Sequence, residues 1–292
     1  MNNTFHYSFM VRQLRSFFQD QKGFIEVPTQ SRTSILAACE DPENITEYTI
    51  GHQTFPLPQT GQMWLEYEIL KNPELPGTFC ISTSYRDEQS PIEGRHQRVF
   101  PMFEFEAHGT FDDLKKLEEE LLLFLGFEAP IPINYSKTAQ SLETDIIEAC
   151  HEMVLEKKYG SSISLEKFPV HTNPFWNMKS EDEMVYNKID ILLHGIETIG
   201  SGERETDVNR MYKRFFTIKN GRYADLLFSK FTRDRVLKEL DEYLALPMIP
   251  RFGGGIGITR LERAMQLSHL FEREEREREY IKINASASQA FI

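Results

Sequence analysis

The sequence has 292 residues, 40% of them apolar and 27% charged, which suits one large α/β domain or two small ones and argues against disorder. The net charge of −12 gives the chain no long-range attraction for nucleic acid, although a local basic patch would still bind it. We find no apolar run long enough to span a bilayer, and the start, MNNTFHYSFMVRQLRSFF, lacks the charged and apolar blocks of a secretory signal.

The first predicted unit is a helix followed by a strand. Apolar residues recur at helical spacing over residues 5–22, as at Leu14 and Phe17, and Gly23 ends the pattern. The segment GFIEVPT then reads as a strand that Pro28 stops.

Residues 31–60 are rich in loop formers, and a short amphipathic helix is predicted over residues 58–70 with Thr60 as a possible cap. Two acids in this part are of interest. Glu40 lies in the acidic stretch ACEDPENI, and a single Glu in such a loop usually faces solvent. Glu66 is expected on the exposed side of the short helix.

The stretch from Phe79 to Glu106 predicts two antiparallel strands joined by a long polar loop over residues 89–98. Its charged residues are unusual for a sheet: Arg86, Glu88, Arg95, His96 and Arg98. Charges on a sheet cost desolvation unless they meet a partner. The loop is therefore either solvated and linked by salt bridges, or a cradle for a polyanion such as a nucleoside triphosphate.

Two further helices are predicted to be structural, over residues 110–127 and 141–157. In KIDILLHGIETIGSGERETD, Ile189 to Leu193 reads as a strand, and Asp190 and Glu197 are expected to converge across the turn at Gly195. Two carboxylates near a triphosphate fit Mg²⁺, whose other ligands would be phosphate oxygens. The alternative is a pair of surface acids, although Asp190 within an isoleucine-rich strand is costly without a partner.

Residues 222–246 show a helical pattern, and PMIPRFGGGIGITRLERAM predicts a glycine-rich strand that runs into a helix with Arg260 near its start. The glycines would let the backbone approach a planar ligand, although a packed turn is the usual interpretation of such a stretch. The charged tail that follows is assigned no chemistry.

The stretches over residues 79–106 and 253–265 resemble the second and third conserved motifs of class II aminoacyl-tRNA synthetases, in the expected order and at the expected separation. The match is closest to the catalytic domain of the asparaginyl members of the aspartyl, asparaginyl and lysyl subgroup. Residues 9–30 resemble the first motif, with Pro28-Thr29 in place of Thr-Pro. The resemblance implies an α+β fold with an antiparallel sheet flanked by helices, a single catalytic domain over residues 1–292, a third motif over about 250–265, and a homodimer built on the first motif.

The resemblance also implies roles in binding ATP and Mg²⁺. The side chains that would contact ATP are Arg86, Glu88, Arg95, His96, Phe100 and Arg260. Arg86 would hold the α-phosphate and the substrate carboxylate, and Phe100 would stack on adenine with Arg260 on the opposite face. Asp190 and Glu197 match the acids that carry Mg²⁺. Val99 and Thr259 depart from the pattern, because each stands where the subgroup has an acid.

By the same resemblance, four residues would bind the amino acid. Glu40 would take the substrate ammonium, and Gln62 and Glu66 match the Ser-Gly-Gln and following Glu of asparaginyl enzymes. Arg204, in SGERE, would read the side-chain carboxylate or amide, a task that suits the rigid fork of arginine.

Full-length relatives carry an anticodon-binding barrel, and this sequence begins at the first motif, so no such domain is expected and tRNA charging is doubtful. We therefore predict an ATP-dependent ligase that activates aspartate or asparagine as an acyl-adenylate, most concretely an ammonia-dependent asparagine synthetase. The alternatives are aminoacyl transfer to tRNA, a carrier protein or a small molecule, and a non-catalytic paralogue that binds ATP or an amino acid as a regulator.

The three cysteines, Cys39, Cys80 and Cys150, lie far apart and form no CxxC pair. This spacing argues against a zinc site or a disulfide framework and suits a reducing compartment. We expect a cytoplasmic protein without a membrane partner.

Overall fold

The computed structural model describes residues 3–28, 35–38, 40–92 and 95–272. Within them, an eight-stranded sheet runs in the order β1 (Ile25–Glu26), β4 (Gly77–Tyr85), β5 (Val99–His108), β10 (Arg251–Gly257), β9 (Ile196–Glu203), β8 (Val185–Leu193), β7 (Ser162–Pro169) and β6 (Ile131–Asn134). The inner strands pair antiparallel, and the edge strands β1 and β6 pair parallel with their neighbours. A separate hairpin joins β2 (Glu47–Ile50) to β3 (Gln53–Pro56). The predicted α+β fold is confirmed.

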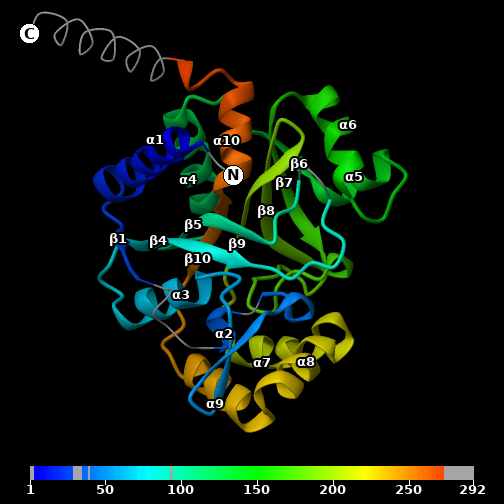
Figure 1. The fold of residues 1–292 in the computed structure, drawn as a ribbon. Helices are drawn as coiled ribbons and strands as arrows, with labels where there is room; N and C mark the ends of the chain where they lie inside the picture. The colour runs from blue at the N-terminus through cyan, green and yellow to red at the C-terminus, as the bar shows by residue number, and fades with distance from the viewer. Residues whose placement is uncertain (1–2, 29–34, 39, 93–94, 273–292) are drawn as a thin grey trace, which may run out of the picture.

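The central strands present two chemically different faces, because side chains alternate along a strand. One face carries Phe79, Phe103, Phe105 and Ile256, which belong to the largest apolar core. This core is closed by α1 (Thr4–Arg15) with its π-helical continuation Ser16–Gln21, by α4 (Phe111–Leu125) and by α10 (Ile258–Leu267). Figure 1 shows these three helices together beside the sheet.

The opposite face of the central strands carries polar side chains and glycines, beside Phe100 and Met102 of β5. It carries the odd-numbered glycines of β10, and buried Ser82, Glu104 and Glu106 on β4 and β5. Helix α3 (Gln62–Lys71) packs against this side, and a second apolar core joins it to α2 (Ile35–Ala38), α7 (Val208–Thr217), α8 (Arg222–Phe231) and α9 (Arg233–Leu244). These helices lie below the sheet in Figure 1. A polar, glycine-lined surface is thereby left between two hydrophobic cores.

Several predicted helices and strands are confirmed, but the boundaries predicted for two helices are wrong. The helix predicted over residues 141–157 is two helices, α5 (Tyr135–Ser141) and α6 (Ala149–Tyr159), and the helical pattern over 222–246 is divided between α8 and α9. Thr232, at that division, has a φ of 68°, a left-handed value that apolar periodicity does not reveal. Residues 29–30 of the first motif and the tail from 273 lie outside the described residues.

The described part of the chain contains no helix with the length and apolarity needed to cross a membrane. Cys80 is buried and Cys150 is exposed, and Cys39 lies outside the described residues.

One acid lies on the apolar side of the sheet. Glu118 of α4 is only 1% exposed. Burial raises the pKa of Glu118 from 4.5 to about 8; the hydroxyl of Ser201 opposes this shift, whereas Asp190 and Glu166 add repulsion. Because the folded chain binds this proton more tightly than the unfolded chain, its contribution lowers the free energy of unfolding as pH rises from about 4.5 to about 8.

We therefore expect Glu118→Gln to raise the free energy of unfolding above pH 8 by about 1–2 kcal/mol, since it removes a charge from an apolar site. The gain should become small as pH falls through 4.5 and vanish well below it, where Glu118 is protonated in both the folded and the unfolded chain. Urea denaturation across this pH range measures it, with the exposed neighbour Glu119→Gln as the control. Equal pH profiles for the two variants would contradict the prediction.

Candidate active site

A pocket lies over the polar face of the sheet, and most of the predicted site residues line it. These are Glu40, Gln62, Arg86, Glu88, Arg95, His96, Phe100, Glu197 and Arg260. They come from segments far apart in the sequence, including the loop after β4, the start of β5, β9 and the first turn of α10. The remaining predicted residues, Glu66, Arg204 and Asp190, do not line this pocket.

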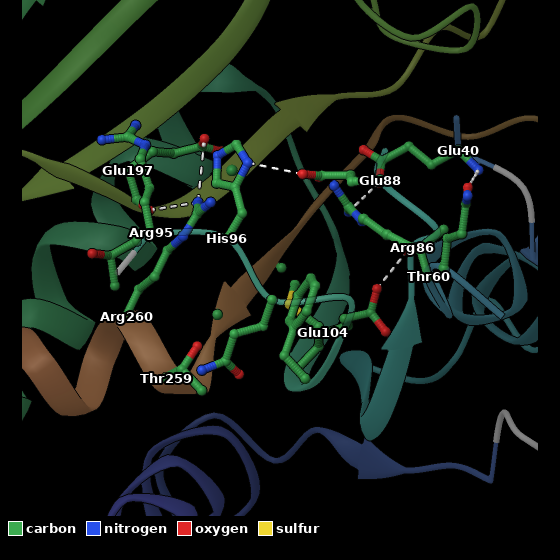
Figure 2. A pocket seen from close by; sticks show the side chains of 18 of the residues that line it. Glu40, Thr60, Arg86, Glu88, Arg95, His96, Glu104, Glu197, Thr259 and Arg260 are labelled. Atoms are coloured by element: carbon green, nitrogen blue, oxygen red, sulfur yellow. Dashed lines mark hydrogen bonds and ion pairs between the residues drawn. The ribbon is translucent and has the colours of Figure 1, made fainter. Parts of the chain in front are cut away.

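Arg86 dominates one end of the pocket. Its Nη2 donates to Glu40 Oε2 at 2.8 Å, and its guanidinium carbon lies 5.6 Å from the centre of the Phe100 ring. Its Nε lies 3.3 Å from Ser84 Oγ, and Ser84 in turn donates to the carbonyl oxygen of Gln59. Figure 2 shows Arg86 and Glu40 together on one side of the pocket. The guanidinium is thus oriented by a strand residue and faces an aromatic ring.

A second cluster of charges lies at the other end (Figure 2). Arg260 donates through Nη1 to the carbonyl oxygen of Glu197 at 2.9 Å, and the same nitrogen lies 3.5 Å from Glu197 Oε2. Arg95 donates to Glu152 Oε2 at 2.6 Å. Each arginine that lines the described pocket therefore already contacts a carboxylate, so an incoming anion must compete with that partner.

Glu88 and His96 lie between the two ends, with His96 Nδ1 2.8 Å from Glu88 Oε2. Both come from the loop between β4 and β5, whose arginines Arg86 and Arg95 pair with Glu40 and Glu152 outside it. The sequence left open a salt-bridged loop or a polyanion cradle. The structure shows the salt bridges, and it shows them on the wall of a pocket.

Glu104 is a pocket residue that sequence analysis missed. It is fully buried, and its carboxylate accepts hydrogen bonds from the hydroxyls of Thr60 and Ser82 and from the backbone N–H of Gly61 at 2.8 Å. Burial raises the pKa of Glu104 above its ordinary value although these hydrogen bonds oppose the shift. The sequence did contain a pattern that could have identified Glu104. Glu104 and Glu106 occupy alternate positions of an otherwise apolar strand, which places both acids on one face.

Arg204 lies directly behind Gln62. It is 2% exposed, and its Nη2 donates to Gln62 Oε1 at 3.1 Å. The same guanidinium makes a forked contact with Glu106, at 3.1 Å from Nε and 3.0 Å from Nη2. Burial raises the pKa of Glu106 to about 7 against the attraction of Arg204. Arg204 therefore reaches the pocket through Gln62.

Glu66 corrects the sequence-based expectation. It was expected on the exposed side of a helix, but it is 1% exposed and accepts hydrogen bonds from Arg251 at 2.6 Å, Asn177 at 2.7 Å and Tyr243 at 2.7 Å. Burial raises its pKa, but Arg251 and Arg204 outweigh that effect and hold the pKa of Glu66 below its ordinary value. The expectation was wrong because α3 is covered both by the sheet and by the helices of the second core, and Glu66 lies on a covered side.

Asp190 and Glu197 do converge, as the sequence predicted. A Cβ added at Gly200 would lie 2.9 Å from Glu197 Oε1 and 3.7 Å from Asp190 Oδ1, so both acids lean over a residue without a side chain. Two carboxylates at this separation could share a Mg²⁺ ion with phosphate and water, provided that no protein cation already occupies their oxygens. In the described part of the chain no group of three or more His, Cys, Asp or Glu residues is arranged for a metal.

An ammonium lies beside these acids. Lys188 Nζ is 2.7 Å from Oδ1 and 2.7 Å from Oδ2 of Asp190. Burial lowers the pKa of Lys188, but Asp190 and Glu197 outweigh burial and raise it, so the side chain stays charged. Burial raises the pKa of Asp190 to about 7, with Lys188 opposing the shift and Glu197 adding to it. Lys188 was not among the predicted site residues.

The fold and the pocket together define a class II synthetase-like catalytic domain, and comparison with known proteins agrees. The family model described as tRNA synthetases class II (D, K and N) matches residues 1–270, and the chain belongs to this family. An asparagine–tRNA ligase of Pelotomaculum thermopropionicum is 25% identical over 289 residues, which cover 85% of this chain and 61% of that protein. A lysine–tRNA ligase of Thermosipho africanus is 22% identical, with 89% of this chain and 59% of that protein covered.

Among solved structures, the asparaginyl-tRNA synthetase of Pyrococcus horikoshii complexed with asparaginyl-adenylate superposes with a TM-score of 0.72 at 21% identity, over 89% of this chain and 64% of that one. A putative aspartyl-tRNA synthetase from Leishmania major gives 0.70 at 16% identity, over 89% and 61% of the two chains. These likenesses establish the fold. The chain spans about three-fifths of the length of the curated relatives above, 61% and 59%.

The contact between Glu106 and Arg204 requires a glycine opposite it. A Cβ on Gly253 would lie 1.7 Å from Glu106 Oε2 and 2.5 Å from the carbonyl oxygen of Phe105. We expect Gly253→Ala to lower the free energy of unfolding by about 1–3 kcal/mol, because it overpacks a buried strand. Urea denaturation measures the loss.

Gly257→Ala is the matched control on the same strand, because the nearest atom to its Cβ would be Arg260 Cδ at an ordinary 3.6 Å. If both alanine variants are equally stable, the close approach at Gly253 does not constrain the strand.

Proposed function

We propose that this protein is an ATP- and Mg²⁺-dependent ligase that activates aspartate or asparagine as an acyl-adenylate. The observation that carries the proposal is that Arg86, Phe100 and Arg260, from separate sequence motifs, line one pocket. Their proximity lets one adenine nucleotide contact all three. The family to which the chain belongs supports the same proposal.

The reaction joins a carboxylate oxygen to the α-phosphorus of ATP and releases pyrophosphate. No general base is needed, because the attacking carboxylate is already ionised at neutral pH. The chain's task is to position the two substrates and to balance charge as it shifts toward pyrophosphate.

Arg86 is placed to serve both substrates. Its guanidinium would contact the α-phosphate and the attacking carboxylate, and the Phe100 ring beside it offers a face for adenine. To do this, Arg86 must exchange the carboxylate of Glu40, now at 2.8 Å, for the phosphate. Glu40 is then free to take the ammonium of the amino acid, so that the two substrates replace one ion pair with two.

The opposite end suits the departing phosphates. Arg260 and Arg95 lie there, and Glu197 would offer a carboxylate to Mg²⁺. When bound, the ion would neutralise charge on the phosphate oxygens. Arg260 stands at the first turn of α10, where the helix N-terminus adds to the attraction for an anion.

Gln62 and Arg204 are proposed to read the side chain of the amino acid. Gln62 lines the pocket and accepts from Arg204 at 3.1 Å. A ligand carboxylate or amide oxygen would replace the Gln62 oxygen as the acceptor for Arg204 Nη2. Because Glu106 already offsets the charge of Arg204, the pair suits a neutral amide as well as an acid.

The most concrete form of this activity is ammonia-dependent asparagine synthesis, in which the adenylate forms on the side-chain carboxylate of aspartate and ammonia displaces AMP. The net charge of −12 supports a small acceptor over a polyanionic one. Transfer to tRNA, a carrier protein or another small molecule starts from the same adenylate. Only the second half-reaction, in which the adenylate is consumed, therefore distinguishes these acceptors.

The test is ATP–pyrophosphate exchange measured with each of the twenty amino acids. We expect exchange with aspartate or asparagine only, and for the synthetase, AMP release that ammonium stimulates. ATP binding without exchange for any amino acid would instead indicate a regulator.

We expect Arg86→Ala to lower exchange by about 10²-fold or more, because it removes a charge-assisted contact in the transition state, while leaving the unfolding midpoint within a degree or two. Arg222→Ala is the matched control: Arg222 is an exposed arginine that pairs with Glu43 outside the pocket. If Arg86→Ala unfolds the chain, or retains full exchange, the role given to Arg86 is wrong.

We further propose a homodimer through α1 and β1, as the first motif implies. Phe5 on α1 and Ile25 on the edge strand β1 expose 58% and 46% of their surfaces. Sedimentation equilibrium at micromolar concentration should give twice the chain mass, and Ile25→Glu should shift it toward the monomer. A wild-type monomer at every concentration would exclude the dimer.

A further inference from the structure

We propose that Lys188 is a built-in counter-cation for Asp190, so that Asp190 carries no divalent ion and Glu197 alone supplies a protein carboxylate to the metal that accompanies ATP. This inference rests on the proposed function. It departs from the sequence-based expectation that both acids carry Mg²⁺.

The geometry of β8 places the ammonium and the carboxylate together. Lys188 and Asp190 are two residues apart on one strand and therefore share a face. They lie opposite Gly202 and Gly200 of β9, so no side chain of that strand separates them. Lys188 Nζ lies 2.7 Å from each oxygen of Asp190, so both oxygens already have a cationic partner.

A third contact fixes the ammonium. Lys188 Nζ lies 3.8 Å from the centre of the Phe168 ring, whose face attracts a cation. The side chains of Lys188 and Asp190 are only 22% and 12% exposed. The pair is therefore held within the molecule, where charges interact more strongly than in water.

A metal on Asp190 would have to displace this ammonium or lie against it. Mg²⁺ binds carboxylate oxygens at about 2.0–2.1 Å, which would bring two like-charged centres close together in a site of low dielectric. Neither arrangement is favourable while Lys188 keeps its contacts. An ammonium at hydrogen-bond distance from both oxygens instead supplies the charge balance that the metal would give.

Glu197 is placed differently. It lines the main pocket, its side chain is 37% exposed, and its nearest side-chain cation is Arg260 Nη1 at 3.5 Å. Asp190 and Lys188 line a neighbouring cavity instead, together with Phe168 and Glu152. The two acids thus meet over Gly200 from different cavities, and only Glu197 faces the space assigned to the triphosphate.

The experiment uses Mn²⁺ as a probe for Mg²⁺. It measures the number of Mn²⁺ ions that each chain binds in equilibrium dialysis, at saturating ATP and above neutral pH. We expect wild type and Asp190→Asn to retain the same number of ions per chain. Lys188→Met, which keeps the apolar stem against Phe168, should retain one more, and the double variant should return to the wild-type number. Lys179→Met, which breaks a comparable 2.7 Å pair with buried Glu203 outside both cavities, should match wild type.

Two results would overturn the proposal: loss of an ion in Asp190→Asn, or no gain in folded Lys188→Met. Should Lys188→Met fail to fold by circular dichroism, the comparison of wild type with Asp190→Asn decides alone. Failure of the proposed function is distinguishable, because it would appear as absent amino-acid-dependent exchange in wild type, whatever the manganese count.

Discussion

A buried ion-pair network beneath the pocket is the constraint on which the rest of the site depends. Glu66 of α3 contacts Arg251 of β10 at 2.6 Å, and Glu106 of β5 contacts Arg204, just past β9, at 3.0 Å. Arg204 Nε also lies 3.6 Å from Glu66 Oε1, which joins the two pairs. All four side chains are at most 2% exposed. Such charges cost desolvation, and removal of one partner leaves the others uncompensated, typically at 3–5 kcal/mol.

The network gives three neighbouring strands and one helix a single register. A slip of one residue in β10 would turn Arg251 away from Glu66 and place a side chain where Gly253 now leaves room for Glu106. The buried charges therefore fix the register of the strands and add little net stability. Arg204 donates a hydrogen bond to Gln62, so the network also orients this side chain, which lines the pocket.

The sequence predicted those parts of the site that lie within continuous motifs. Arg86, Phe100 and Arg260 fall in the two stretches that resemble conserved synthetase motifs, and all three line the pocket. Asp190 and Glu197 were brought together correctly, because a tight turn between two paired strands fixes their separation. The α+β class followed from the resemblance of these motifs to those of class II synthetases.

What the sequence did not predict depends on packing between distant segments. Glu66 was taken as exposed because periodicity locates one apolar face of a helix and cannot show that both faces are covered. Glu104 gained its partners from Thr60 and Ser82, more than 20 residues away. Lys188 was passed over because a lysine in a strand next to an acid looks like an ordinary surface pair until its depth is known.

The electrostatic state of the pocket reconciles an acidic protein with the triphosphate ligand that we propose. Each cation of this region forms an ion pair with a carboxylate. These cations are Arg86, Arg95 and Arg260 in the pocket and Lys188 beside it. A neutral pair costs less to bury than a lone charge, and it does not attract anions over long distances. A ligand must then be recognised at close range, by replacing the carboxylate that each arginine contacts. This exchange favours a ligand that offers several oxygens in a fixed geometry. It also favours a ligand that brings a cation for the displaced carboxylates. ATP with a divalent metal and an amino acid with its ammonium meet that requirement jointly, whereas a lone anion leaves the displaced acids without partners.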